Sequence, residues 1–263
     1  MKTSFDTRFS LIKTFVKRDI VSRYQGSVFG SLWLLAQPLM QLALYSFVFG
    51  IIFRMKWNLE TDGGNVHFGF ILFSGILLHS FLSESLLRGP CLVTSYPSYV
   101  KKVIFPLNIL ALVNSFSALA TYLFGLVVLI TVFIISGGEI SVNYIFLIFP
   151  IVMIFLFTLG FSWLLSAIGV YFKDINNFMT HLVTILLFTA PICYPMSMLP
   201  EKYQSLLYLN PITLPLLIFQ DIVFKDQFEF SWSILVHLSV GSLLCCIGYI
   251  VFNKLKRGFS DAI

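Results

Sequence analysis

The sequence predicts an all-α integral membrane protein, and three observations support this fold class. First, 58% of the 263 residues are hydrophobic and only 11% are charged, whereas a soluble domain carries about 25% charged residues. Second, the apolar residues form continuous stretches of the length that a helix needs to cross a bilayer, about 20 residues. Third, the Lys and Arg residues concentrate in alternate connections between these stretches.

We predict six membrane-spanning helices, because six stretches are long and apolar enough. In chain order they are Leu32–Phe53, Phe68–Leu87, Pro106–Ile135, Tyr144–Phe172, Phe178–Met196 and Trp232–Phe252. The third and fourth exceed the minimum length, so they must tilt, kink or protrude. The whole chain, 1–263, is then a single transmembrane domain, with residues 1–31 before the spans (32–252) and a tail at 253–263.

The connection between the fifth and sixth spans is expected to be a re-entrant or interfacial segment. Its apolar stretch Leu206–Phe219 is too short to cross a bilayer, and Pro211 and Pro215 interrupt it. Proline removes a backbone donor and breaks helices. We therefore expect the region Pro191–Phe230 to dip into one face of the membrane and return.

The basic residues predict the orientation of the chain. With six spans, all Lys and Arg residues fall on the side that holds both termini, except Arg54, Lys56, Lys202 and Lys225. The positive-inside rule places that side in the cytoplasm. A seventh span would move the basic C-terminal tail outside, against the rule, so we expect both termini to be cytoplasmic.

Residues 1–31 are expected to form an amphipathic helix in the cytoplasmic interface of the membrane, and their mixed composition differs from that of a secretory signal. Apolar residues recur every three or four positions, at Phe5, Phe9, Ile12, Val16 and Ile20. This spacing puts them on one face of a helix. In the interface, Lys17, Arg18 and Arg23 would meet anionic lipid headgroups. The alternative is a helix packed on a partner protein beneath the membrane.

The sequence lacks the motifs of an enzyme. It contains no Gly-x-x-x-x-Gly-Lys, no His-Glu-x-x-His and no Cys-x-x-Cys, so it offers neither a phosphate-binding loop nor a metal-ligand spacing. We therefore expect no catalytic residue, no metal, no cofactor on this chain and no nucleic-acid partner. The third to fifth spans hold no Asp, Glu, Lys or Arg, which argues against proton or sodium coupling. Energy is expected to come from another subunit.

Two spans carry uncharged polar faces at helical spacing. They comprise Gln37, Gln41 and Tyr45 in the first span, and Asn114, Ser117 and Thr121 in the third. Small and polar side chains join helices to one another within membranes. Alternatively, these residues line a path for an uncharged, hydroxyl-rich substrate, and the sequence leaves both interpretations open.

The connection between the second and third spans, residues 88–105, is the best candidate for contact with a soluble motor, because it is short and mixed in polarity. The residues expected to make this contact are Arg88, Tyr96, Pro97, Tyr99, Lys101 and Lys102. Arg88 also follows Glu84 by four residues, and this spacing lets the two pair on one helix face. A contact of Glu84 with a partner domain is the alternative.

Several groups of residues, in order along nearly the whole chain, match a known family. They are Lys17–Tyr24, Gly30–Trp33 and Gln37–Pro38; Val100–Pro106; Val170–Ile175; Ala190–Tyr194, Leu199–Tyr203 and Leu209–Pro211; and Phe252–Phe259. With these motifs the chain resembles the permease subunit of a type-2 ABC exporter, in the branch that exports bacterial polysaccharides such as O-antigen. The chain departs from the family pattern at Leu107 and Lys173, where the family often has Arg.

The resemblance implies a homodimer of six-span subunits in the bacterial inner membrane, served by two copies of an ATP-binding subunit that holds ATP and Mg²⁺. The dimer would enclose a channel for a lipid-linked polysaccharide. Residues 196–229 would form a periplasmic gate. To this gate we assign Asn210 and Pro211 within the range, and Pro191, Tyr194 and Pro195 just before it.

Phosphate groups on the lipid carrier would be drawn to Arg18, Arg23, Lys101 and Lys102, unless these are simply solvated charges. Export of capsule or teichoic acid is the alternative substrate assignment. An ATP-independent channel or secondary carrier is the alternative mechanism, and the lack of clustered carboxylates and histidines disfavours a membrane glycosyl- or acyltransferase.

Overall fold

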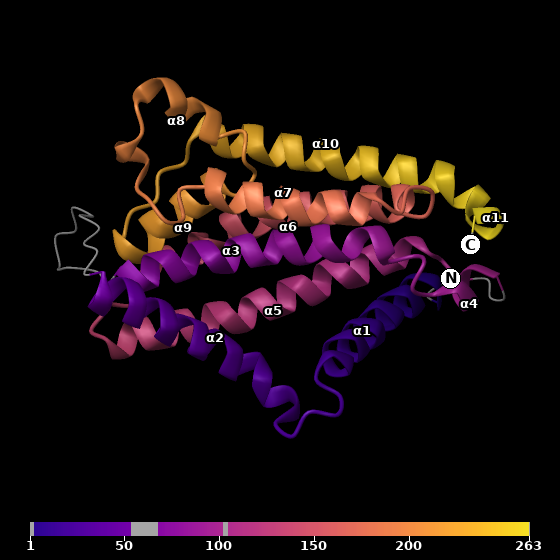
Figure 1. Ribbon diagram of the computed structural model, residues 1–263, viewed down its shortest axis with the longest axis horizontal. Coiled ribbons are helices and arrows are strands. Elements are labelled where there is room, and N and C mark those ends of the chain that lie inside the picture. The colour runs from indigo at the N-terminus through magenta and orange to yellow at the C-terminus, as the bar shows by residue number, and fades with distance from the viewer. Residues whose placement is uncertain (1–2, 54–67, 102–104, 263) are drawn as a thin grey trace.

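The computed structural model describes residues 3–53, 68–101 and 105–262, and every regular element in these ranges is a helix. The predicted all-α fold class is therefore confirmed. Figure 1 shows a bundle of long helices with both chain termini at one end, which we call the terminal end; helix α8 (Glu201–Leu207) projects from the other, the α8 end. Lys102, Arg54 and Lys56, named above, lie outside the described residues, as does the side chain of Phe5.

Five helical segments in the described part of the chain are long and apolar enough to cross a membrane. They are Gly30–Ile52, Phe68–Cys91, Asn108–Ile135, Val142–Ile168 and Trp232–Ala262. Their main helices are α2 (Trp33–Tyr45), which continues as a π-helix (Ser46–Ile52), α3 (Phe68–Arg88), α5 (Asn108–Ile135), α6 (Ile148–Ile168) and α10 (Trp232–Leu255). They correspond to the first, second, third, fourth and sixth predicted spans.

The predicted fifth span is shorter than expected. Helix α7 (Ile175–Thr189) starts before Phe178 and ends well before Met196. Ala190 is extended, with φ −89° and ψ 147°, because a residue that precedes a proline disfavours the helical conformation, and Pro191 follows. The helix therefore ends at the first of the prolines, and the count of six spans stays a prediction.

The proline-interrupted segment divides into two helices. Helix α8 is followed by a turn at 208–212 and by α9 (Thr213–Phe224), so Leu206–Phe219 is not one helix. Helix α9 packs on α3 and α6, and its residues Leu216, Phe219 and Ile222 are fully buried. The break at Pro211 is as expected, and the re-entrant path through a membrane stays a prediction.

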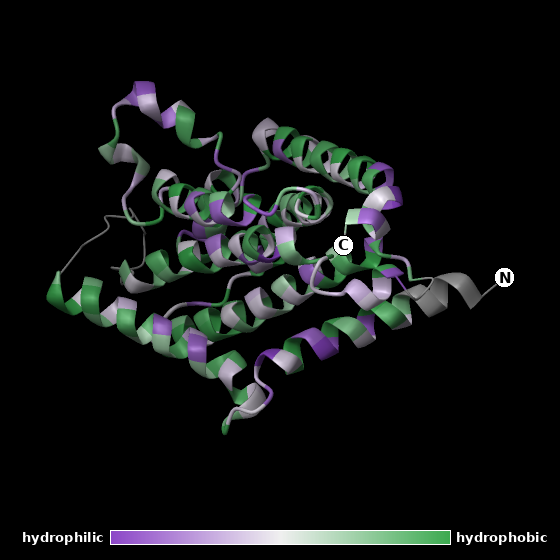
Figure 2. Cartoon of the chain, turned by 45° about the vertical axis from the view of Figure 1, so that its right-hand side comes forward, coloured by the Kyte–Doolittle hydropathy of each residue, from purple (hydrophilic) through white to green (hydrophobic). Residues whose placement is uncertain are grey.

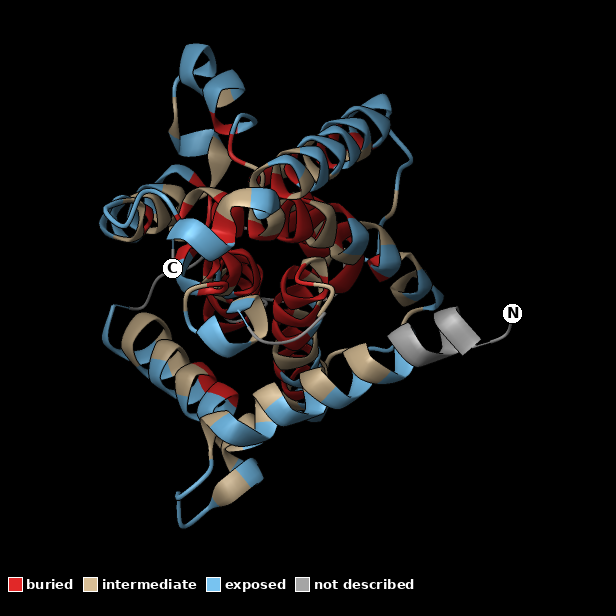
Figure 3. Ribbon diagram, turned by 90° about the vertical axis from the view of Figure 1, so that its right-hand side faces the viewer, coloured by how far each residue is buried: buried red, intermediate tan, exposed pale blue. Residues whose placement is uncertain are grey.

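Helix α3 forms the centre of the bundle, and α2, α5, α6, α7 and α9 pack around it. Its side chains from Phe70 to Phe73 and from Phe81 to Leu82 are at most 5% exposed, and Figure 3 shows this buried interior. By contrast, α2 and α10 expose apolar side chains such as Leu39 and Leu243, and Figure 2 shows that hydrophobic residues predominate along both helices. Such exposed apolar faces suit contact with lipid or with another membrane helix.

Among the helices in the described part of the chain, α6 and α10 share the most extensive contact. A Cβ on Gly160 would lie 2.9 Å from the backbone nitrogen of Cys245, and a Cβ on Gly248 would lie 2.5 Å from the carbonyl oxygen of Gly160. Glycines at a crossing allow two backbones to approach where a larger side chain would separate them. The Cys245 thiol, 2.9 Å from the carbonyl oxygen of Leu156, adds a polar contact.

Candidate functional site

The terminal end carries a group of four charged side chains, which we call the charge square. Asp19 and Arg23 lie one turn apart on α1 (Thr3–Arg23), and Glu84 and Arg88 lie one turn apart at the end of α3. Residues four apart share one face of a helix. The structure brings these two faces together, although 69 residues separate Asp19 from Arg88.

Each cation in the charge square contacts both carboxylates. Arg23 lies 2.6 Å from Asp19 through Nη2 and 2.5 Å from Glu84 through Nη1. Arg88 lies 2.5 Å from Asp19 through Nη2 and 3.2 Å from Glu84 through Nη1. The side chain of Asp19 is 10% exposed and that of Arg88 is 34% exposed. The square is electrically neutral and ties α1 to α3.

The predicted pair between Glu84 and Arg88 is confirmed. Their additional partners are Arg23, which contacts Glu84, and Asp19, which contacts Arg88, and both lie on the chain's own helix α1. The sequence did contain a signal for this contact, since Asp19 and Arg23 are four residues apart, as are Glu84 and Arg88. What the sequence did not show is that the two helices face each other.

The charge square sets the protonation of Asp19. Burial alone would raise the pKa of the Asp19 carboxyl, but hydrogen bonds and charges from Arg88 and Arg23 outweigh it and lower the pKa from 3.8 to about 2. Because folding lowers this pKa, the stability that Asp19 contributes is complete above pH 3.8 and is lost as the pH falls through about 2.

Replacing Asp19 by Asn should therefore lower the melting temperature of the purified protein at pH 5, and the difference from the unmodified protein should shrink between pH 4 and pH 2. The neutral amide removes two ionic contacts at every pH, while protonation removes them from the unmodified protein only in acid. Thermal unfolding of both proteins across this pH range measures the difference. A difference that stays constant down to pH 2 would contradict the assigned role of Asp19.

Next to the charge square, residues 88–101 and Phe105 pack against α1. After a 3-10 turn (Gly89–Cys91), Pro97 begins the short helix α4 (Pro97–Lys101), as proline does at first helical positions. The ring of Tyr99 stacks on Phe105 with centroids 4.9 Å apart, and Phe15 of α1 lies 5.4 Å from Phe105. The loop expected to meet a soluble motor thus contacts the N-terminal helix, for which packing on a partner protein was the alternative prediction.

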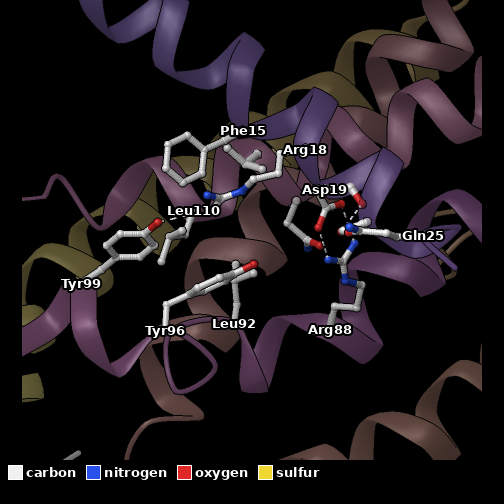
Figure 4. A pocket seen from close by; sticks show the side chains of 12 residues that line it. Phe15, Arg18, Asp19, Gln25, Arg88, Leu92, Tyr96, Tyr99 and Leu110 are labelled. Carbon is white, nitrogen blue, oxygen red and sulfur yellow. Dashed lines mark hydrogen bonds and ion pairs between the residues drawn. The ribbon is translucent and has the colours of Figure 1, made fainter.

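A cavity of about 430 Å³ opens between α1, this loop and the start of α5. Figure 4 shows Arg18, Tyr96 and Tyr99 on one side of it and two members of the charge square, Asp19 and Arg88, on the other. The Arg18 guanidinium lies 4.4 Å from the centre of the Phe15 ring, a cation–π contact. Lys17 and Lys101 are exposed, so they remain accessible to charged groups.

Comparison with known proteins places this arrangement in a family. A family described as ABC-2 type transporter matches residues 10–224, which include most of α1, the charge square and α4. The chain belongs to the ABC-2 type transporter family. It is 25% identical over 265 residues to an O-antigen export system permease protein RfbA of Klebsiella pneumoniae, covering 100% of this chain and 98% of that protein.

Two further relatives have the same description. A second RfbA of Klebsiella pneumoniae is 24% identical over 265 residues, covering 100% of this chain and 98% of that protein. An RfbA of Myxococcus xanthus is 26% identical over 260 residues, covering 96% and 95%. The likeness to permeases of O-antigen export systems therefore extends along the whole ABC-2 chain.

The uncharged polar residues of this ABC-2 permease fall into two places. Asn114 is 1% exposed and donates hydrogen bonds to Ser85 at 2.9 Å and Ser162 at 3.0 Å, which joins α5 to α3 and α6. Ser117 is also fully buried within the bundle. For these two residues, burial favours the interpretation that they pack helices together.

The other polar candidates gather between α2, α3 and α5. Gln37, Gln41 and Thr121 line a cavity of about 90 Å³ there, and Tyr45 is half-buried nearby on α2. Thr121 also lies 3.4 Å from the Arg23 guanidinium, so this cavity adjoins the charge square. A role of these residues in a substrate channel stays a prediction.

At the α8 end, Asn210 joins the segments that we assigned to a gate. Its amide donates to the carbonyl oxygen of Leu186 at 2.8 Å and to the Thr189 hydroxyl at 2.9 Å, and its Oδ1 accepts from the backbone of Ile212. Pro191 is buried beside it, and Tyr194 donates to the carbonyl oxygen of Phe188. Pro195 is half-buried before the 3-10 turn Met196–Met198, and Pro211 lies in the turn before α9. The gate role of these residues stays a prediction.

Replacing Asn210 by Ala should lower the free energy of unfolding by about 1–3 kcal/mol, the cost of leaving buried hydrogen-bonding groups without partners. Thermal unfolding in detergent measures this loss. Asn177→Ala, at an exposed position of α7, is the matched control and should change little. Equal effects of both substitutions would show that Asn210 does not hold α7 to α9.

Proposed function

We propose that this chain is the membrane subunit of an ATP-driven exporter that moves a lipid-linked polysaccharide, O-antigen in particular, across the bacterial inner membrane to the periplasm. The observation that carries this proposal is the full-length similarity to permeases of O-antigen export systems. The terminal end holds most of the Lys and Arg residues, which makes it the cytoplasmic end. The α8 end is then periplasmic.

Energy comes from a separate ATP-binding subunit, present in two copies, that holds ATP and Mg²⁺. The surface of the permease that this subunit binds is the α1–loop junction, which we define as α1, residues 88–101 and Phe105. This proposal is supported by the position of both segments at the terminal end and by their aromatic contact. Two copies of the permease enclose the channel between them.

The charge square gives this junction a mechanical role. Asp19 and Arg23 of α1 form ion pairs with Arg88 and Glu84 at the end of α3. A displacement of α1 or of the loop therefore moves α3, the central helix of the bundle. Closure of the ATP-binding subunits therefore acts on α3, and α3 contacts α2, α5, α6, α7 and α9.

The test is deletion of the gene, followed by analysis of surface polysaccharide and of lipid-linked intermediates in the cytoplasmic leaflet. We expect loss of the surface polymer and accumulation of its lipid-linked precursor. The lost polymer distinguishes O-antigen from capsule or teichoic acid. An ATPase should copurify with the permease. An inactive mutant of that ATPase should cause the same loss of surface polymer as the deletion. Transport that persists without ATP would overturn the proposal.

A further inference from the structure

The C-terminal segment contributes to a second hydrophobic cluster, shared with the 88–101 loop and with α5, which we call the terminal core. Its buried members are Leu92, Val93, Leu107, Leu110, Ala111, Ala167, Val170, Phe252 and Phe259. The sequence presents residues 253–263 as a basic tail, yet Phe259 is 0% exposed. The tail is therefore part of the folded bundle at this point.

After α10 the chain turns so that Phe259 enters the terminal core. Tyr171, in the turn after α6, donates a hydrogen bond to the carbonyl oxygen of Leu255 at 2.9 Å. A Cβ on Gly258 would lie 2.6 Å from the Tyr171 hydroxyl, so a larger residue there would displace this hydroxyl from its hydrogen bond. After this 3-10 turn (Lys256–Gly258), the Phe259 ring lies 5.6 Å from Phe252, edge to face.

The same core carries the loop that follows α3. Val93 is 0% exposed within it, and helix α11 (Phe259–Ala262) packs against α4. The loop also approaches α6 closely, because a Cβ on Gly169 would collide with the carbonyl oxygen of Pro90, and a Cβ on Gly89 would lie 3.0 Å from Leu165. The loop is thus held by α1 on one side and by the ends of α6 and α10 on the other.

We propose that Phe259 is a positioning residue that seats the 88–101 loop on α6 and α10, so that a push on the loop moves these helices together with α3. The proposal rests on the proposed function for the source of the push. The seating itself does not, because it follows from contacts within this one chain. If residues 256–262 served only to end α10, neither the turn that brings Phe259 into the terminal core nor the contact of α11 with α4 would be needed.

The first test measures seating directly in the full chain in membranes, with Cys91→Ser and Val93→Cys introduced as a reporter. The buried cysteine should react slowly with a maleimide, and adding Phe259→Ala should speed its labelling at least tenfold. The half-buried native Cys193, at the other end of the bundle, should keep its labelling rate. Phe178→Ala, which removes an exposed ring at the start of α7, should leave the reporter protected.

The second test uses the permease assembled with its ATP-binding subunit. Phe259→Ala should lower the amount of polymer exported per ATP hydrolysed at least fivefold while the ATPase stays bound and active, and Phe259→Leu should restore most of the export. The seating proposal is overturned if the reporter stays protected in Phe259→Ala, or if Cys193 becomes equally reactive, which would indicate general unfolding. Normal export per ATP in Phe259→Ala would overturn the role in coupling. Failure of the unmodified permease to bind any ATPase would instead overturn the proposed function, and the labelling result would still decide the seating.

Discussion

Inverting the charges on one helix of the charge square should abolish export, and inverting them on both helices should restore it. The α1 inversion combines Asp19→Arg with Arg23→Asp, and the α3 inversion combines Glu84→Arg with Arg88→Glu. Each inversion alone keeps the pair within its own helix but places like charges at both contacts between α1 and α3. Disrupting a partly buried pair of this kind costs about 3 kcal/mol. All four substitutions together restore every opposite-charge contact.

The measurements are surface polysaccharide in cells and the melting temperature of the purified variants. No separate control for net charge is needed, because each of the three variants keeps the net charge of the charge square. The single substitution Arg23→Glu should weaken export without preventing membrane insertion, since it leaves Arg88 with three carboxylates. Normal export by both single-helix inversions would show that the attachment of α1 to α3 is not needed. If both single-helix inversions are inactive and the fourfold variant does not restore export, side-chain shape matters as well as charge.

Replacing Gly160 by Leu should prevent stable folding, and this is the largest effect that we expect from one small residue. A Cβ at this position would lie 2.8 Å from the Leu244 side chain and 2.9 Å from the backbone of α10. Overpacking costs about 1–3 kcal/mol, and here the helix backbones themselves must separate. Because α10 leads into the terminal core, the change should also loosen the loop beneath α1.

Gly50→Leu is the matched control for this prediction. Gly50 also lies in a membrane-spanning segment, but a Cβ there would meet nothing within 4 Å. We expect the Gly50 variant to accumulate in membranes and melt like the unmodified protein, while the Gly160 variant accumulates poorly. Equal yields and melting temperatures would show that α6 and α10 can adjust at their crossing.

Much of this fold could be predicted from local sequence features. Long apolar stretches located the five long helical segments, and the ends of α5 at Ile135 and of α3 at Arg88 lie within a residue of the predicted boundaries. The fifth predicted span extended too far at its C-terminal end, because the helix stops where Pro191 forces its neighbour out of the helical conformation. Hydropathy continues through this point, so an apolar window does not detect the break.

The site was only partly visible in the sequence. Arg88, Tyr96 and Tyr99 were expected in the contact loop, and they do lie beside α1. Asp19 and Phe259 lie within the family motifs Lys17–Tyr24 and Phe252–Phe259, but their structural roles were not predicted, because an acidic residue in a basic segment and an aromatic residue in a basic tail look like ordinary surface positions. Their importance depends on which distant residues they meet, and spacing along one helix cannot show that.

The sequence by itself determined the class of the protein, its helical segments, the bias of basic residues to one end and the resemblance to ABC-2 permeases. These properties follow from hydropathy, prolines and charge, which act over one helix length. Only the tertiary structure decided that Arg23 is held between two carboxylates, that Asn114 joins three helices and that the tail returns to support the loop. Such contacts depend on how helices face one another, and that is set by packing over the whole bundle.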